Sequence, residues 1–409
     1  MNEAKAKTIG FFAVALAASC AFAAPQAKES SSPAPQNVPG LMTAFDGRKI
    51  STADEWENVR RPEILKCFEE QCFGVRPEAV RDGKRVSYKI RETNDVLGGK
   101  AVREVVDATY SGPCGDYVFT FVSMRPKAKK PVPVFLNFFL EKGDLAALTA
   151  APDYSDPRWP FADIIARGFA TVAISKMAIA PDDSATCFKK SIFPCVEPLS
   201  ARTKSSWAAI SSWAWGNSRV MDWIESRPDV FDAKHVAVVG HSRGGKTALW
   251  TGATDTRFAM VCSVQSGCGG AKLNHVKLPK SEHIGQITKG FTHWFCKNYL
   301  KWCGKEFEMP FDQHMLAALV APRLLVISSA SLDSWAGQPG EWWTAKLAGP
   351  AWELYGKRGL EADAYPPVDT PQFGGSVGYF VRTGKHSITP YEWARYMDFA
   401  EKHGWKGER

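Results

Sequence analysis

The sequence lacks the features that mark several large classes of protein. After residue 24, no stretch approaches the ~20 uninterrupted apolar residues of a membrane-spanning helix, so no membrane span is expected. The cysteines, histidines and acidic residues show no metal-ligand spacing, so we expect neither a metal nor a cofactor, and a metal-dependent deacetylase fits poorly. The net charge of +8 is spread along the chain and not gathered into a basic arm, which argues against a nucleic-acid partner.

The first forty residues have the composition of an export signal followed by a tether. An apolar run over residues 9–18 follows two lysines, and Ala-Phe-Ala at residues 21–23 fits the small-x-small pattern for cleavage. We therefore predict a signal peptide over residues 1–23 and a mature protein that is secreted or periplasmic. Residues 24–40 are rich in Pro, Ser, Ala and Gln, which predicts a flexible linker, and residues 41–409 are expected to form a single catalytic domain.

The cysteines leave two questions open. Cys20 could be the lipidated N-terminus of an outer-membrane lipoprotein, although the residues before it match that signal poorly. The other nine cysteines are an odd number, so at least one thiol stays unpaired within the chain even in an oxidising compartment. Two disulfides are candidates, Cys67–Cys72 and Cys187–Cys195. Either could form, and the spacing of the cysteines does not settle the connectivity.

Apolar runs alternate with helical patterns along most of the chain. This alternation predicts an α/β fold with a mostly parallel central sheet and helices on both faces. The expected strands are residues 86–91, 117–124, 132–139, 169–174, 235–239, 260–264, 323–328 and 377–381, and the expected helices are residues 161–167, 206–226 and 246–251.

A serine sits in the setting that a nucleophile requires. The strand expected at residues 235–239 runs into the GHSRGGK sequence of residues 240–246 and then into a helix, so the G-x-S-x-G pattern lies at a strand-turn-helix junction. Small residues on both sides allow the strained turn that exposes the hydroxyl. We predict Ser242 as the nucleophile; the alternative is a Gly-rich turn without catalysis.

A serine hydroxyl needs an oriented base, and the chain supplies one in the usual order of acid and then histidine. Asp333 follows the apolar strand near residue 324, and His386 follows the apolar stretch 377–381, so both come after the carboxyl end of a strand. We predict His386 as the base and Asp333 as the acid. Of the other histidines, we expect His275, His283 and His403 to be exposed and His293 and His314 to be buried.

Several motifs together resemble the glucuronoyl esterases of carbohydrate esterase family 15, which have the α/β-hydrolase fold. The likeness extends from Arg202 to Phe399. The motifs that carry it are WAWG at residues 213–216, GHSRGGK at 240–246, SGCGG at 266–270, HWFC at 293–296, PFDQH at 310–314 and GKH at 384–386.

The resemblance implies hydrolysis of the ester between 4-O-methyl-glucuronic acid of xylan and a lignin alcohol. Glucuronoxylan and lignin-carbohydrate esters would then be the partners of a chain that we expect to be monomeric. The resemblance also implies that Arg243 stabilises the oxyanion, that Lys246 and Glu282 hold sugar hydroxyls, and that Trp335 packs along the sugar. A guanidinium beside the nucleophile suits a developing negative charge, which supports the first of these roles independently.

Two positions depart from the family pattern. Many members carry the catalytic Glu where this chain has Gln265, and an amide cannot stabilise an imidazolium as a carboxylate does. Bacterial relatives instead place an acid after the next strand, where this chain has Asp333. Residues 272–275, Lys-Leu-Asn-His, replace arginines that relatives often carry near the sugar, which bears on the substrate more than on the reaction.

Two other functions fit parts of the pattern. One is an esterase of different specificity, such as an acetyl or feruloyl xylan esterase or a general carboxylesterase; an acetyl ester has no use for Lys246, Glu282 and Trp335. The other is a catalytically silent carbohydrate-binding relative, which only Gln265 favours.

Overall fold

The computed structural model describes residues 33–139, 143–151 and 153–407 of the chain. The predicted signal peptide, Cys20 and residues 24–32 of the predicted linker lie outside the described residues. No helix in the described part of the chain combines the length and the apolar character needed to cross a bilayer.

The remaining residues of the predicted linker, 33–40, form hydrogen bonds with the rest of the protein. Trp343 Nε1 donates a hydrogen bond to the Pro33 carbonyl at 2.9 Å. His314 Nε2 bonds the Pro39 carbonyl at 3.1 Å. This stretch therefore runs along the body of the protein up to residue 40.

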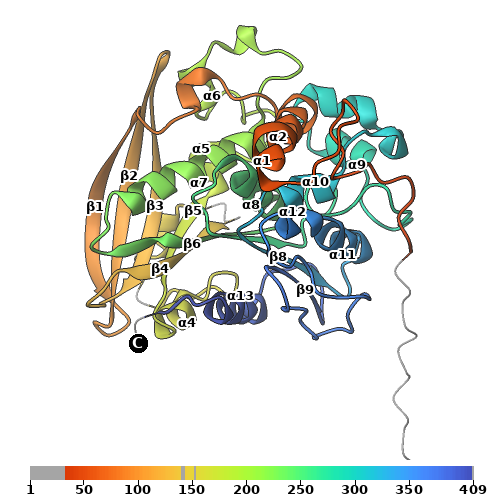
Figure 1. Ribbon diagram of the computed structural model, residues 1–409. Coiled ribbons are helices and arrows are strands. Elements are labelled where there is room, and N and C mark those ends of the chain that lie inside the picture. Colours follow the sequence, from red (N-terminus) through yellow and green to blue (C-terminus); the bar gives the residue numbers. More distant parts are fainter. Residues whose placement is uncertain (1–32, 140–142, 152, 408–409) are drawn as a thin grey trace, which may run out of the picture. The chain divides into compact units, whose positions relative to one another are not determined.

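A nine-stranded sheet forms the centre of the molecule (Figure 1). Its strand order is β1-β2-β3-β5-β4-β6-β7-β8-β9. The pairs β1-β2, β2-β3 and β3-β5 are antiparallel, and all later pairs are parallel. The strands are β1 (Val86–Val96), β2 (Ala101–Gly112), β3 (Gly115–Pro126), β4 (Val132–Phe139), β5 (Ala170–Ser175), β6 (Phe231–His241), β7 (Met260–Val264), β8 (Leu324–Ala330) and β9 (Val377–Arg382).

Helices cover both faces of this sheet. The α-helices are α1 (Ala53–Glu55), α2 (Arg61–Phe68), α3 (Leu145–Leu148), α4 (Phe161–Ala166), α5 (Lys176–Ile179), α6 (Phe193–Val196), α7 (Ala209–Glu225), α8 (Arg243–Thr254), α9 (Ile284–Gly290), α10 (Gln313–Ala318), α11 (Gln338–Leu347), α12 (Pro350–Glu353) and α13 (Pro390–Lys402). Two π-helical turns, η1 (Trp56–Arg60) and η2 (Glu69–Phe73), flank α2, and the 3₁₀ turns are η3 (Glu78–Val80), η4 (Leu199–Ala201), η5 (Lys297–Trp302) and η6 (Glu306–Glu308).

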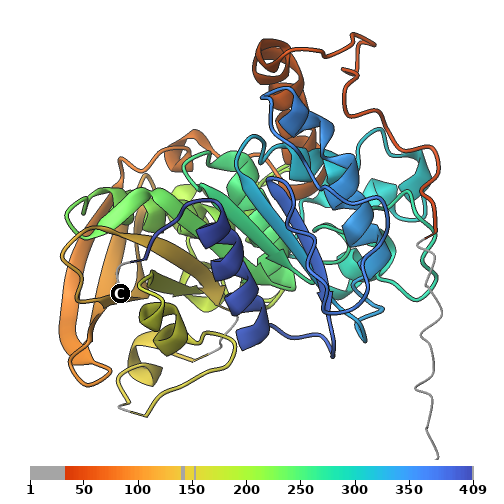
Figure 2. The ribbon, with the colours of Figure 1, turned by 60° about the horizontal axis from the view of Figure 1, so that its bottom comes forward.

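The alternation of side chains along each strand creates two separate cores. In β4, Leu136 and Phe138 point into a core shared with α7 and α8, whereas Phe135 and Phe139 point into a second core shared with α4 and α13. Figures 1 and 2 show α7 and α8 on one face and α4 and α13 on the other. The predicted arrangement, a mostly parallel sheet with helices on both faces, is confirmed.

The strand β2 is not among the strands expected from the sequence. Its run of charged residues interrupts the apolar pattern, yet Arg103 and Glu104 are both buried. Arg103 is bonded to Glu92 at 3.1 Å, and Glu104 accepts from Arg227 at 2.6 Å. Buried charges that find partners in this way are compatible with a central strand.

The nine cysteines of the described residues all carry free thiols. Neither candidate disulfide, Cys67–Cys72 or Cys187–Cys195, is present in this structure. The thiols of Cys72, Cys262 and Cys268 are fully buried, and burial raises their pKa values, which keeps them protonated and unreactive.

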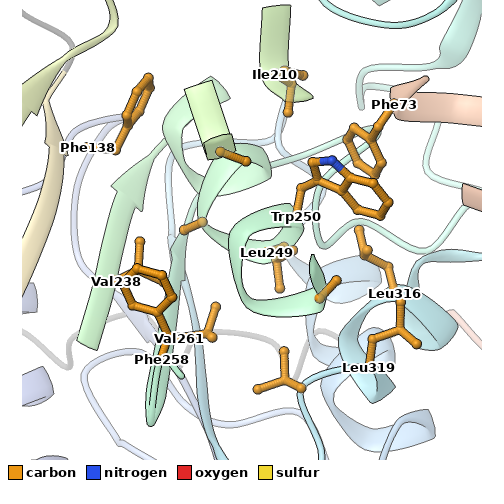
Figure 3. Close-up of a cluster of buried hydrophobic side chains, with 14 of the residues drawn as sticks. Phe73, Phe138, Ile210, Val238, Leu249, Trp250, Phe258, Val261, Leu316 and Leu319 are labelled. Atoms are coloured by element: carbon orange, nitrogen blue, oxygen red, sulfur yellow. The ribbon is translucent and has the colours of Figure 1, made fainter. Parts of the chain in front are cut away.

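A fully buried tryptophan of α8 joins the helices that cover the first core. Trp250 stacks on Phe73 with ring centroids 4.4 Å apart, and its Nε1 donates to Ser211 Oγ at 3.3 Å. Figure 3 shows the Trp250 ring beside Phe73, with Leu316 near it. The ring therefore connects α8, the helix that follows Ser242, to the N-terminal helices.

Replacement of this ring should destabilise the protein strongly. Trp250→Ala is expected to lower the free energy of unfolding by about 3–5 kcal/mol, because it removes a large buried side chain and leaves a cavity. The measurement is urea unfolding followed by circular dichroism. Val118→Ala, at a position that is 56% exposed, is the control and should change little; equal midpoints for the two variants would contradict the assigned role of Trp250.

Candidate active site

A pocket of about 170 Å³ is lined by residues from the loops that follow the carboxyl ends of the parallel strands. Six of the seven predicted site residues line it, namely Ser242, Arg243, Lys246, Glu282, Trp335 and His386. Two hollows of about 500 Å³ elsewhere contain none of the predicted residues, so volume alone does not identify the site. The chemical groups that line the 170 Å³ pocket identify it as the candidate site.

The order of the strands explains why distant residues meet here. β6, β7, β8 and β9 are consecutive, parallel neighbours in the sheet, so their carboxyl ends lie at one edge. Ser242 follows β6, Gln265 follows β7, Asp333 follows β8 and His386 follows β9. One edge of a parallel sheet thereby collects a hydroxyl, an amide, a carboxylate and an imidazole.

Ser242 occupies a strained turn between β6 and α8. Its φ is 59° and its ψ is −122°, a conformation that non-glycine residues rarely adopt. A Cβ atom on Gly240 would lie 2.0 Å from the Gly244 carbonyl oxygen, so the turn closes only around glycine. The turn projects Ser242 into the pocket at the start of the helix.

His386 and Asp333 form a short hydrogen bond. His386 Nδ1 lies 2.5 Å from Asp333 Oδ2. The carboxylate is buried, and its Oδ1 accepts from the Ala336 backbone N–H at 3.3 Å. Because Nδ1–H donates to the carboxylate, Nε2 carries the lone pair and is the atom that can accept a proton.

Ser242 and His386 line the same pocket. No hydrogen bond joins the two side chains in the described part of the chain. In unliganded enzymes the hydrogen bond between nucleophile and base is often long and shortens when the substrate binds. The ring of His241, the residue before Ser242, lies 4.4 Å from the ring of His386. Burial lowers the pKa of His241 to about 3, so this neighbour stays uncharged in neutral solution.

Arg243 is held by a buried carboxylate that the sequence analysis does not identify. Its Nη1 bonds Asp182 Oδ2, and its guanidinium lies 4.7 Å from the ring centroid of Trp294. Asp182 also accepts from Lys176 Nζ at 2.6 Å and from His293 Nε2 at 3.0 Å. Burial alone would raise the pKa of Asp182, but the His293 hydrogen bond and the Arg243 charge outweigh it and hold the pKa well below its usual range.

Lys246, Glu282 and Trp335 form one connected cluster. Lys246 Nζ lies 3.3 Å from Glu282 Oε2 and donates to the Cys268 carbonyl at 2.7 Å. Trp335 Nε1 donates to Glu282 Oε1 at 3.1 Å. Lys246 and Glu282 are buried, whereas Trp335 is 48% exposed, so the indole forms the accessible face of the cluster.

Lys272, one of the departures from the family pattern, is hydrogen-bonded to the backbone of this cluster. Its Nζ donates to the Glu282 carbonyl at 2.6 Å, and the side chain is buried. His275, which was expected to be exposed, is in fact buried and bonds Asp312 at 2.7 Å. The polar sequence around His275 is buried because Asp312 also accepts the backbone N–H groups of Asn274 and His275.

A second acidic residue absent from the sequence analysis lies behind the site. Glu341, on α11, is fully buried and accepts from Ser329 Oγ at 2.6 Å and from the Gly267 backbone N–H at 3.0 Å. Burial raises the pKa of Glu341 to about 7, although both hydrogen bonds act in the opposite direction. No sequence signal marks either Glu341 or Asp182. Gly267, which bonds Glu341, and Arg243, which bonds Asp182, are both distant in the chain.

Comparison with known proteins assigns the chain to a family. The family model described as "Glucuronyl esterase, fungi" matches residues 159–356. Carbohydrate esterase MZ0003, from an unknown prokaryotic organism, is 32% identical over 395 residues, covering 90% of this chain and 89% of that relative. The chain belongs to the glucuronoyl esterases of carbohydrate esterase family 15.

Two further relatives support this family assignment. The solved structure of a glucuronoyl esterase from Solibacter usitatus is 33% identical, with a TM-score of 0.81, and the match covers 91% of this chain and 99% of that one. A 4-O-methyl-glucuronoyl methylesterase from Schizophyllum commune is 29% identical over 308 residues, or 72% of this chain and 67% of the relative. This member of family 15 is a carboxylic ester hydrolase, and its predicted α/β-hydrolase fold is confirmed.

The raised pKa of Glu341 predicts a specific pH dependence of stability. Between its ordinary pKa of 4.5 and about 7, the folded esterase holds a proton that the unfolded chain has released, so the free energy of unfolding falls as the pH rises. Glu341→Gln removes this effect. From about pH 5 to about pH 8, the variant should gain stability relative to wild type by up to about 1.4 kcal/mol per pH unit.

The measurement is the urea midpoint of both proteins across that pH range. Glu78→Gln is the matched control, since it replaces the same titratable carboxyl group by an amide on an exposed side chain. A pH-dependent change of the same size in both variants would contradict the assignment to Glu341.

Proposed function

We propose that this protein hydrolyses the ester between (4-O-methyl-)glucuronic acid of glucuronoxylan and a lignin alcohol, with Ser242, His386 and Asp333 as its catalytic triad. One observation carries the proposal. The pocket that contains the strained Ser242 and the carboxylate-bound His386 also contains the cluster of Lys246, Glu282 and Trp335.

The triad chemistry follows from the hydrogen bond between His386 and Asp333. His386 Nε2 accepts the hydroxyl proton as Ser242 Oγ attacks the ester carbonyl, and Asp333 stabilises the imidazolium that forms. The same imidazolium then gives its proton to the departing alcohol, which leaves an acyl-enzyme on Ser242. A water molecule, activated by His386 in turn, releases the uronic acid.

Arg243 is the group we assign to the oxyanion. Its guanidinium lines the pocket next to the nucleophile, and its Nε is buried without a hydrogen-bond partner among the described residues. The ion pair with Asp182 and the contact with Trp294 fix its position before the substrate arrives. A donor that is already oriented stabilises the tetrahedral intermediate without reorganisation during the reaction.

The neighbouring cluster suits a sugar acid. Glu282 and Lys246 offer an acceptor and a donor for hydroxyl groups, and the exposed indole of Trp335 offers a flat apolar face to the sugar ring. The 4-O-methyl-glucuronoyl methylesterase name of the Schizophyllum commune relative supports the same substrate. We also propose that the protein is secreted or periplasmic, because its polymeric substrate lies outside the cell.

The experiment that tests this function compares two esters. Purified wild-type protein should hydrolyse benzyl glucuronate with a much higher kcat/KM than 4-nitrophenyl acetate. Ser242→Ala should lower kcat for the glucuronate at least about 10⁴-fold, because the remaining groups provide only binding and oxyanion stabilisation. Activity on the acetate alone would indicate a general or acetyl esterase, and activity on neither would indicate a silent binding protein.

Trp335 should discriminate between these esters. Trp335→Ala is expected to raise KM for benzyl glucuronate about fivefold to tenfold, in line with about 1–1.4 kcal/mol of aromatic contact, and to leave 4-nitrophenyl acetate hydrolysis unchanged. Trp335→Phe, which keeps a ring but loses the Nε1 donor to Glu282, should fall between wild type and Trp335→Ala. The same loss on both esters would show that Trp335 does not contact the sugar.

A further inference from the structure

The side chain of Gln265 forms two hydrogen bonds with the loop that carries His386. Its Oε1 accepts from the Ser387 backbone N–H at 2.8 Å, and its Nε2 donates to the Ser387 carbonyl at 2.8 Å. The side-chain amide therefore meets Ser387 as the backbone of a neighbouring strand would, with one donor and one acceptor. Gln265 is 1% exposed, so its amide is shielded from bulk solvent.

The backbone of Gln265 is itself held in an unusual conformation. Its φ is 47°, in the left-handed region that residues other than glycine rarely occupy. Its N–H donates to the Ser328 carbonyl at 2.7 Å, which anchors the end of β7 to β8. Strain of this kind persists where surrounding contacts fix a side chain in one place.

The same amide also contacts the ring beside the base. His241 Nε2 lies 3.3 Å from Gln265 Oε1, so the neutral imidazole donates to the amide oxygen. The His241 ring in turn lies 4.4 Å from the His386 ring at an interplanar angle of 45°. Gln265 thus acts on His386 in two ways, through the backbone of the next residue and through the ring packed against it.

We propose that Gln265 is a positioning residue that holds the His386 imidazole in place through Ser387 and His241, and that this role requires a neutral amide. The inference rests on the proposed Ser242–His386–Asp333 triad. It assigns to Gln265 a task different from that of the glutamate that many family members carry at this position.

The surrounding charges explain the need for an amide. Gln265 Nε2 lies 3.3 Å from Glu392 Oε1, and the Ser387 carbonyl is a second acceptor at the same atom. A carboxylate would present an oxygen to both acceptors and would be repelled by them. Arg382 is the nearby cation, but its guanidinium already donates to Glu392 and to three carbonyls, those of Thr383, Lys385 and Ser387.

A set of variants separates positioning from simple packing. Gln265→Glu keeps the shape but loses the donor, Gln265→Met keeps the volume but loses both bonds, and Gln286→Glu is the matched control. Gln286 is exposed on α9, and its Oε1 accepts from the His283 N–H at 3.1 Å, a bond that a glutamate also makes. Asp333→Asn and the double variant Gln265→Glu/Asp333→Asn complete the set.

The readout is kcat and KM for benzyl glucuronate between about pH 5 and about pH 9, with the melting temperature of each variant. Gln265→Glu and Gln265→Met should each lower kcat about 10-fold to 100-fold with little change in KM, because small displacements of a base are costly. The loss in Gln265→Glu should shrink as the pH falls, since a protonated carboxyl regains the donor. The loss in Gln265→Met should be nearly independent of pH.

The double variant tests whether this position can still supply the acid. We expect Gln265→Glu not to restore activity to Asp333→Asn. Restored activity, or Gln265→Glu and Gln265→Met variants as active as Gln286→Glu, would overturn the inference; Gln265→Met decides the matter if Gln265→Glu does not fold. Failure of the proposed function is seen separately, as full activity of Ser242→Ala or Asp333→Asn.

Discussion

The turn from β6 into α8 is the constraint on which the site depends. Ser242 can adopt its left-handed conformation only because Gly240 and Gly244 approach each other more closely than any side chain would allow. This geometry fixes Ser242 at the carboxyl edge of the parallel sheet. The loops after β7, β8 and β9 then need only extend a few residues to bring Gln265, Asp333 and His386 to the same edge.

Around this turn, the protein buries charged groups in connected sets. Lys246 and Glu282 are buried together, and Asp182 has two cations and two ring N–H donors as partners. Isolated charges in such surroundings would be strongly destabilising, whereas paired ones keep a defined position in a region of low dielectric constant. The polarity of the site is therefore built into the protein before any substrate binds.

The sequence could predict the parts of this arrangement that are local. Apolar runs located most strands of the parallel sheet, and the residues just after them included Ser242, Asp333 and His386, because a buried strand and the polar turn after it are contiguous. The strand β2 was not predicted. Its buried Arg103 and Glu104 form ion pairs with residues outside this strand, and the sequence pattern does not show these pairs. Asp182 and Glu341 were not predicted as site residues either, because each bonds a residue far away in the chain. The resemblance to the family, and not the local pattern, pointed to Glu282 and Trp335.

The sharing of Asp182 between Lys176 and Arg243 has a consequence for how this region can change over evolutionary time. A substitution at Asp182 would leave the buried Lys176 and the partly exposed Arg243 without the carboxylate that they share. The loss of either cation would leave the carboxylate with a remaining counterion. The three positions should therefore behave as a unit whose mutational effects are not additive. Family members that replace the carboxylate are expected to replace its cations as well. Residues at these three positions should therefore covary among members of the family.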